Sequence, residues 1–184
     1  MSGEKDSMIV IVDNGKGAED IARFIRAQKT IVKPKDAASA KGSAYILSDG
    51  DLKNQRDNVK LIEKTNKPLL GIGAGYVFLG AAFGAKAVPT KGGKIETVKI
   101  ERPSPLTLDM KKMFSVVQTV THGFQDLPEN FNVFASSSKY EFKIIQENEK
   151  PFFGVHFNPE QGSEGIKILD NFCRFVEIWE KYHR

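Results

Sequence analysis

The chain has 184 residues, of which 40% are hydrophobic and 27% charged, and a formal net charge of +4. A chain of this length and composition buries a core of its own, which excludes a disordered protein. Its single cysteine excludes an internal disulfide framework, and no apolar run reaches the ~18 residues that a membrane-spanning helix needs.

Residues 1–7, MSGEKDS, resemble neither a signal peptide nor a transit peptide. No linker or internal repeat divides the chain after them. We therefore expect a cytoplasmic protein with a flexible segment at residues 1–7 and a single domain at residues 8–184.

The first half of the chain alternates short apolar strands with amphipathic helices. We expect strands at residues 8–12, 30–32, 44–47 and 68–72, and helices at residues 18–28, 52–65 and 76–83. Short β-branched strands are typical of a parallel sheet that is buried on both faces. Right-handed crossovers between them predict an α/β fold of three layers, with a doubly wound, mainly parallel sheet and flanking helices.

The second half contains strands separated by turn residues, which predicts an antiparallel extension of the sheet. We expect strands at residues 94–101, 116–120, 131–136, 141–146 and 152–157, and a long helix at residues 164–182. Four aromatic residues widen the apolar face of this helix: Phe172, Phe175, Trp179 and Tyr182. They either pack into the core or form a strip that docks a partner, such as a second copy of the chain.

The most informative segment is Leu70-Gly71-Ile72-Gly73-Ala74-Gly75, where a buried strand turns sharply into a helix. Glycines on either side of the central residue are typical of a nucleophile elbow. The backbone N–H groups and the helix dipole at such a turn stabilise an anion. An enzyme needs Cys or Ser at the centre of the turn, where this chain has Gly73.

The elbow and three other segments resemble the class I glutamine amidotransferases, in particular the free-standing, archaeal-type amidotransferase subunits of GMP synthetase. The other three are Ile11-Val12-Asp13-Asn14-Gly15, Leu47-Ser48-Asp49-Gly50 and Gly154-Val155-His156-Phe157-Asn158-Pro159-Glu160. The resemblance implies a flavodoxin-like sheet and a role in purine biosynthesis without a cofactor. It also implies that the partner is an ATP-using synthetase subunit.

The chain departs from this family at the residues that carry its chemistry. The family's nucleophilic Cys corresponds to Gly73 and its catalytic His to Asn158, and only the Glu that orients this His is kept, as Glu160. An asparagine amide does not titrate near neutral pH and cannot act as a base. Loss of such groups commonly lowers the rate by ~10⁴–10⁶.

The residues around these positions also differ from the family. Tyr76-Val77 replaces the His-Gln pair of the glutamine pocket, and Asp49-Gly50 replaces the Gly-Gly loop that supplies an oxyanion donor. A carboxylate at Asp49 would repel a developing oxyanion. We therefore expect a non-catalytic binding or regulatory protein without catalytic residues, in which Gly73, Asn158 and Glu160 are vestigial.

Three further functions are compatible with the sequence. The N–H groups of Gly73, Ala74, Gly75 and Tyr76, with the Asp49-Gly50 loop, could hold a small anion or carboxylate. The chain could still be a glutamine-hydrolysing subunit that supplies ammonia for GMP synthesis. A weaker alternative is association with nucleic acid through basic residues, which we do not expect because 27 basic residues are scattered among 23 acidic ones.

The remaining chemically capable side chains have simpler interpretations. Cys173 lies on the apolar stripe of the last helix and is expected to be a core thiol. His156 alternates with apolar neighbours and is expected to be structural, whereas His122 and His183 are expected to be solvated. Their spacing predicts no metal site. Asp49 and Asp51 could suggest a cation site, but a helix cap at Asp51 explains this pair more simply.

Overall fold

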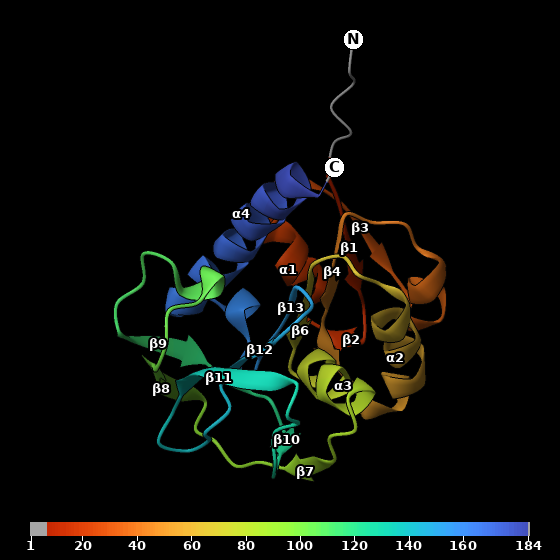
Figure 1. Ribbon diagram of the computed structural model, residues 1–184. Coiled ribbons are helices and arrows are strands. Elements are labelled where there is room, and N and C mark those ends of the chain that lie inside the picture. The colour runs from red at the N-terminus through yellow and green to blue at the C-terminus, as the bar shows by residue number, and fades with distance from the viewer. Residues whose placement is uncertain (1–6, 184) are drawn as a thin grey trace.

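A nine-stranded sheet forms the centre of the computed structural model, which describes residues 7–183 (Figure 1). Apart from Ser7, the expected flexible segment at residues 1–7 lies outside the described residues. In the order of the sheet, the strands are β3 (Gln28–Val32), β1 (Met8–Val12), β4 (Ala44–Leu47), β6 (Leu69–Ile72), β13 (Phe152–Val155), β12 (Ile144–Glu147), β11 (Phe131–Ser136), β8 (Ile95–Ile100) and β9 (Met113–Val117).

The sheet has a parallel and an antiparallel part. The neighbouring strands β3, β1, β4, β6 and β13 pair in parallel, whereas β12, β11, β8 and β9 continue the sheet with antiparallel pairs. Numbered along the chain, the parallel strands follow the order 2-1-3-4-5 of flavodoxin-like folds. The predicted fold class is confirmed.

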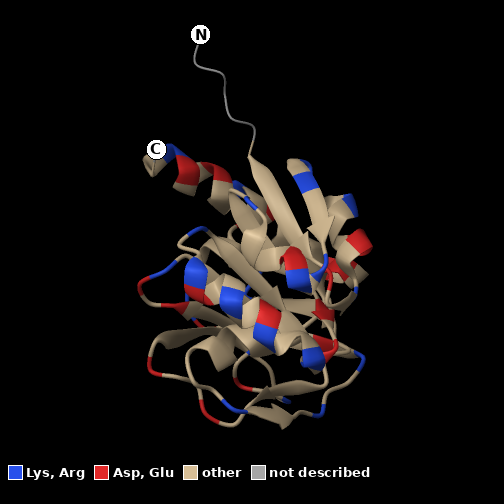
Figure 2. Cartoon of the chain, turned by 90° about the vertical axis from the view of Figure 1, so that its right-hand side faces the viewer, with Lys and Arg blue, Asp and Glu red and all other residues tan. Residues whose placement is uncertain are grey.

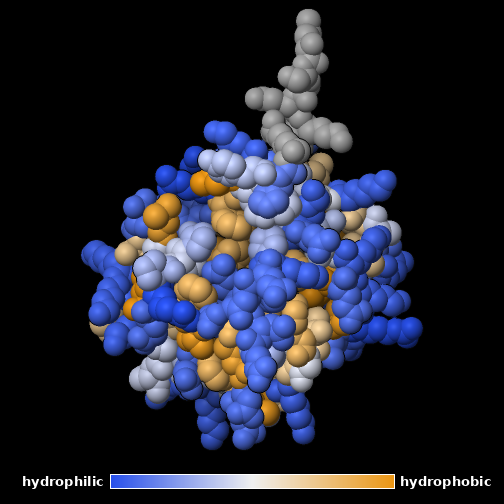
Figure 3. Space-filling model, in the orientation of Figure 1, coloured by the Kyte–Doolittle hydropathy of each residue, from blue (hydrophilic) through white to orange (hydrophobic). Residues whose placement is uncertain are grey.

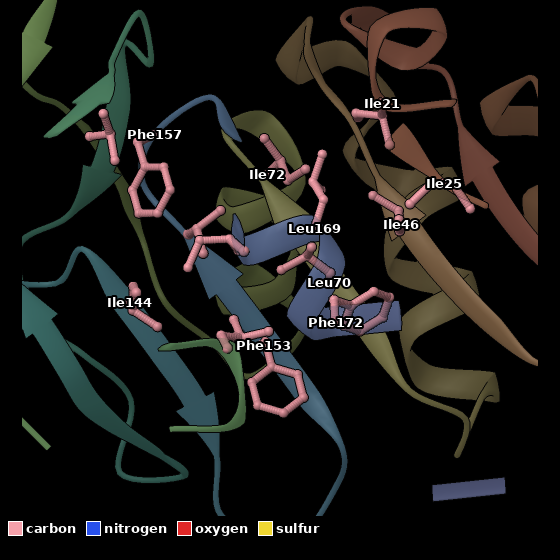
Figure 4. Packing of buried hydrophobic residues seen from close by; sticks show 14 of the residues in the cluster. Ile21, Ile25, Ile46, Leu70, Ile72, Ile144, Phe153, Phe157, Leu169 and Phe172 are labelled. Atoms are coloured by element: carbon pink, nitrogen blue, oxygen red, sulfur yellow. The ribbon is translucent and has the colours of Figure 1, made fainter. Parts of the chain in front are cut away.

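Four helices cover the two faces of the sheet: α1 (Ala18–Phe24), α2 (Gln55–Lys64), α3 (Ala74–Ala82) and α4 (Ile166–Tyr182). In β1, Ile9 and Ile11 pack into the core cluster on the face of α1 and α4, and Val10 and Val12 pack into the one on the face of α2 and α3. Both faces of a parallel strand are therefore apolar, as its sequence predicts. Figure 4 shows the first cluster, where Phe153 from β13 lies close to Phe172 from α4.

Short elements complete the chain. Two small antiparallel pairs are formed by β2 (Gly15–Lys16) with β5 (Asp49–Gly50), and by β7 (Ala87–Pro89) with β10 (His122–Phe124). The sequence pattern did not predict these pairs, because two or three residues show no periodicity. The 3-10 helices are η1 (Pro34–Ser39), η2 (Leu52–Asn54), η3 (Pro105–Thr107), η4 (Pro159–Gln161) and η5 (Ser163–Gly165).

Several predicted boundaries were wrong, most clearly those of one helix and two strands. The helix predicted at residues 18–28 ends at Phe24, because the chain pairs with β1 from Gln28 onward, opposite Met8. The strand predicted at residues 116–120 lies at Met113–Val117, and the one predicted at 141–146 lies at Ile144–Glu147. In each case the ladder with a neighbouring strand decides the boundary, and local propensity does not contain that information.

The last helix is partly a core element. Phe172 is fully buried and cannot dock a partner, which corrects the prediction for this residue. Phe175 and Trp179 are half-buried, and Trp179 stacks on His183 at 4.0 Å between ring centroids. Tyr182 is 76% exposed. Of the predicted docking strip, only the C-terminal end therefore presents aromatic surface.

The surface is polar and of mixed charge. Seen from the side of α2, basic and acidic residues alternate without a large patch of one sign (Figure 2). On the face in Figure 3, apolar residues are interspersed with hydrophilic ones. Within residues 7–183, no helix is long and apolar enough to cross a bilayer.

A buried ion pair lies within the antiparallel part of the sheet. Lys143 Nζ donates to Glu96 Oε2 at 3.0 Å, and the two side chains are 0% and 4% exposed. Lys143 also contacts His156, through Nδ1 at 3.0 Å and through the backbone oxygen. A charge removed from water in this way depends on its partner, because solvent cannot replace the lost interaction.

Replacing Lys143 alone should therefore be more harmful than replacing the pair. Lys143→Met leaves the Glu96 carboxylate buried without its counter-charge and should lower the free energy of unfolding by about 3–5 kcal/mol. The double variant Lys143→Met/Glu96→Gln should lose less than the single variant. Urea denaturation measures both, and equal losses would show that the ion pair does not govern stability here.

Candidate functional site

The predicted site residues converge where the parallel strands end. Asp49 follows β4, Gly73 follows β6, and Asn158 lies three residues after the end of β13. In open α/β sheets, this edge is where ligands bind. Asn14, which follows β1, is tied to the same edge because its side-chain nitrogen donates to the backbone oxygen of Ser48 at 3.0 Å.

Gly73 has the backbone conformation of an elbow, with φ 58° and ψ −112°. This region is unfavourable for residues with a side chain. The flanking glycines allow the strand and helix to pack closely. A Cβ atom at Gly71 would lie 2.5 Å from the backbone oxygen of Gly75, and one at Gly75 would lie 2.6 Å from Leu47 Cβ. The predicted elbow is therefore present.

The Asp49 side chain occupies the space beside Gly73. A Cβ atom at position 73 would lie 2.8 Å from Asp49 Cβ and closer still to its Cγ and Oδ1. Carbon atoms do not approach so closely, so a side chain at position 73 and the present position of Asp49 exclude each other. Asp49 is only 7% exposed. The carboxylate thus lies inside the elbow.

The Asp49 carboxylate accepts hydrogen bonds from three groups. Its Oδ1 accepts from the backbone N–H of Gly50 at 2.8 Å and from that of Ala74 at 2.9 Å. Its Oδ2 accepts from Asn158 Nδ2 at 3.1 Å. Ala74 is the first residue of α3, where the helix dipole favours negative charge. An external anion would have to displace Asp49 from these donors, and anion binding at Gly73 to Tyr76 stays a prediction.

Asn158 is fully buried and held in one orientation. Its Oδ1 accepts from the backbone N–H of Thr119 at 2.8 Å and from the Thr119 hydroxyl at 2.9 Å. Its Nδ2 therefore points toward Asp49 and also lies 3.4 Å from Glu160 Oε1. Asn158 links two carboxyl groups as a hydrogen-bond donor, and it has no basic nitrogen that could take up a proton.

Glu160 is 3% exposed, and its Oε2 has no hydrogen-bond partner among the described residues. Burial, with a smaller contribution from the charge on Asp49, raises the pKa of Glu160 from its ordinary value of 4.5 to about 7. Lys16, whose Nζ donates to Thr119 Oγ1, lowers this pKa slightly. At neutral pH, a large fraction of Glu160 therefore carries a proton.

The cavity that adjoins the elbow is small. The cavity lined by Asp49, Gly50, Leu52, Ala74, Val77, Val120, Thr121 and His122 has a volume of about 10 Å³. A single water molecule needs roughly 10–15 Å³ measured in this way. A glutamine side chain does not fit without displacement of these residues.

Two other titratable side chains considered in the sequence do not belong to the hydrogen-bonded group of Asp49, Asn158 and Glu160. Cys173, on α4, is half-buried and packs against the core, and burial raises the pKa of its thiol to about 11. It is therefore protonated at neutral pH and a poor nucleophile. His156 is fully buried, as expected of a structural residue. Burial and the nearby Lys143 charge lower the pKa of His156 to about 3.

The other candidates are placed as follows. His122 was expected in a solvated turn but is half-buried and begins β10, which pairs with β7, so this prediction was wrong. His183 is exposed, as predicted. Asp51 caps η2 by accepting from the backbone N–H of Lys53 at 2.9 Å. Among residues 7–183, no group of three His, Cys, Asp or Glu side chains could hold a metal ion.

Sequence reasoning missed one residue that positions the site. Asn58, on α2, is fully buried, and its side-chain nitrogen donates to Asn14 Oδ1 at 2.7 Å. The amide of Asn14 donates back to Asn58 Oδ1 at 3.1 Å. The only signal for Asn58 in the sequence was its place close to Leu61 and Ile62, which form the apolar stripe of this helix.

The raised pKa of Glu160 makes stability depend on pH. Between pH 4.5 and about 7 the unfolded chain has released this proton while the folded chain retains it, so stability is present at the lower pH and is lost as pH rises. The loss attributable to this group is about 3 kcal/mol. In Glu160→Gln this contribution should disappear, and the unfolding free energy should fall less between pH 4.5 and 7 than in the wild type.

The exposed Glu63 on α2 provides the matched control. Glu63→Gln should leave the pH profile of chemical denaturation as it is in the wild type. A Glu160→Gln profile identical to that of Glu63→Gln would contradict the assignment of a proton to Glu160.

The chain is similar to known proteins over most of its length. The family model described as glutamine amidotransferase class-I matches residues 11–175. The chain is 28% identical over 183 residues to one subunit of the glutamine-hydrolyzing GMP synthase of Pyrococcus abyssi, covering 91% of this chain and 97% of the relative. It is also 28% identical over 189 residues to the glutamine-hydrolyzing GMP synthase of Campylobacter lari, covering 94% of this chain but only 37% of that longer protein.

Solved structures show the same fold. A crystal structure assigned to a GMP synthase subunit of Thermoplasma acidophilum matches with a TM-score of 0.91 over 98% of both chains at 22% identity. A glutamine amidotransferase from Thermotoga maritima matches with a TM-score of 0.72 at 19% identity, covering 96% of this chain and 86% of that one. The resemblance inferred from the sequence is confirmed. This chain belongs to the class I glutamine amidotransferase family.

Proposed function

We propose that this protein is a non-catalytic relative of the GMP synthetase amidotransferase subunit, with a binding or regulatory role. The observation that carries this proposal is the position of Asp49. At Gly73 there is no side chain to attack an amide, and the place where one would begin is filled by the Asp49 carboxyl group.

The rest of the site supports the same interpretation. Asn158 stands where the resemblance puts the base, and both of its polar atoms are already engaged, with Thr119 and with the two carboxyl groups. The N–H groups of Gly50 and Ala74 are occupied by Asp49 and are not free for an oxyanion. A cavity of about 10 Å³ leaves no space for the substrate.

The relatives suggest where such a protein would act. The Pyrococcus abyssi relative is named as one subunit of a GMP synthase, which implies that its partner is a separate synthetase subunit. We extend this to the present chain, in purine biosynthesis and in the cytoplasm. Residues 8–184 would form a single domain that docks on this subunit or on a second copy of itself. The half-buried Trp179 and exposed Tyr182 at the end of α4 are candidate contacts.

A glutaminase assay tests the proposal. The purified chain, alone and mixed with an ATP-using synthetase subunit from its own cell, is incubated with L-glutamine and the ammonia released is measured. We expect a rate lower by ~10⁴ or more than that of a relative with an elbow Cys. Ammonia release near the rate of that relative would refute the proposal.

The alternative is that the chain is itself the glutamine-hydrolysing subunit for GMP synthesis. The names of its relatives, which are 28% identical to it, favour this alternative. The same assay decides between the two, because hydrolysis requires a nucleophile that the elbow does not have.

Restoring the thiol alone should not restore activity. Gly73→Cys places a side chain against Asp49 and in an unfavourable backbone conformation, so it should lower the unfolding midpoint and produce no ammonia. Gly84→Cys is the matched control, because Gly84 also has a positive φ, 90°, but has nothing within 4 Å of its Cβ position. We expect Gly73→Cys to be the less stable by about 1–3 kcal/mol.

A second comparison isolates the clash. In Asp49→Gly/Gly73→Cys the space beside the elbow is free. The double variant should therefore lose less unfolding free energy than the two single variants lose together. Equal midpoints for Gly73→Cys and Gly84→Cys would show that Asp49 does not block the elbow.

A further inference from the structure

The Asp49 carboxylate lies in a set of donors that comes from separate parts of the chain. The N–H of Gly50 belongs to β5, the N–H of Ala74 begins α3, and Asn158 follows β13. Two of the three donors bind the same oxygen, Oδ1, at 2.8 and 2.9 Å. Backbone N–H groups that converge on one oxygen, at the positive end of a helix dipole, favour an anion over a neutral group.

These donors are held in place by other contacts. Gly50 pairs with Gly15 in the β2–β5 ladder, and the N–H of Asp51 donates to the oxygen of Asn14 at 2.9 Å. Asn158 cannot rotate its amide without losing both hydrogen bonds from Thr119. The donors are therefore preorganised, because contacts with residues other than Asp49 also hold them in position.

The ligand of this donor set is part of the chain. A side chain attached next to the donors has a high effective concentration, so it competes well with anions in solution. Asp49 is 7% exposed, and the adjoining cavity, of about 10 Å³, is too small to hold a second carboxylate beside it.

We propose that the Gly50, Ala74 and Asn158 donors form a carboxylate-binding site whose resident ligand is the side chain of Asp49. This inference rests on the proposed function, because it explains how a site without catalysis is kept closed. It also goes beyond that function, since it assigns a ligand class to the site: when Asp49 is removed, a small monocarboxylate takes its place.

Acetate is the probe for this site. It has the carboxylate of an aspartate side chain, with a methyl group in place of the methylene carbon, so Asp49→Gly leaves a space of about its shape. Titrating acetate at constant ionic strength should raise the Tm of Asp49→Gly by roughly 3–6 °C once acetate exceeds its Kd about tenfold. The wild type should not respond, because its own carboxylate fills the site.

Three controls separate this effect from others. Acetamide tests whether a neutral molecule of the same shape suffices, and sodium chloride tests whether any anion does; neither should reproduce the effect. Asp51→Gly removes a nearby exposed carboxylate that caps a single N–H, and acetate should not stabilise this variant. In a ¹⁵N-labelled Asp49→Gly sample, the amide signals of Gly50 and Ala74 should shift with the same Kd.

The outcomes are distinct. Acetate-specific stabilisation of Asp49→Gly, with saturable shifts at Gly50 and Ala74, supports the proposal. Stabilisation no greater than with acetamide or chloride overturns it, and so does an equal response of the wild type. If Asp49→Gly does not fold in buffer, its refolding yield in acetate is compared with that in acetamide, and equal yields overturn the proposal. The acetate test measures stability, whereas the glutaminase assay measures released ammonia. Either experiment can therefore fail while the other succeeds.

Discussion

The contact between the Asp49 carboxylate and the N–H of Ala74 couples two positions that are distant in sequence. The carboxylate can reach this N–H only because residue 73 has no side chain, and a side chain at residue 73 would fall on Asp49. A side chain at residue 73 and the present position of the Asp49 carboxylate therefore exclude each other in this backbone. Under the proposed function, the absence of a thiol at residue 73 and the presence of Asp49 in the loop are two parts of one rearrangement of the site.

The same edge of the sheet holds Glu160, whose pKa is raised mainly by burial. The charge on Asp49 adds to this effect, and the charge on Lys16 opposes it. The single side-chain nitrogen of Asn158 faces both acids. It lies 3.1 Å from Asp49 Oδ2 and 3.4 Å from Glu160 Oε1. Asp49 receives three donors and a large fraction of Glu160 is protonated near neutral pH, which reduces the repulsion between two negative charges in the same buried space.

The sequence predicted the architecture well, because buried parallel strands and a glycine-flanked elbow are local signals. It predicted the parallel strands, the antiparallel extension and the positions of Gly73, Asn158 and Glu160 after strands. It also predicted that Asp49 would repel an oxyanion, but not that its carboxylate would lie on the oxyanion's donors. That contact joins residues 25 positions apart, and no periodicity reports it. For the same reason the alternating pattern around Lys143 did not reveal that this charge is fully buried.

The physical origin of the closed site lies in the backbone of the elbow. A strand that turns directly into a helix leaves the N–H of Ala74 without an acceptor in the helix, and burying such a group unpaired costs about 1–3 kcal/mol. In an enzyme these donors must stay available for a substrate oxygen. The substrate-free enzyme therefore cannot hold an acceptor of its own in strong hydrogen bonds with them. Under the proposed function the chain is released from that requirement and gains stability by supplying its own acceptor, and Gly73 removes the backbone strain at the same turn. Asp49 and Gly73 are therefore the residues that stability alone would favour at these two positions.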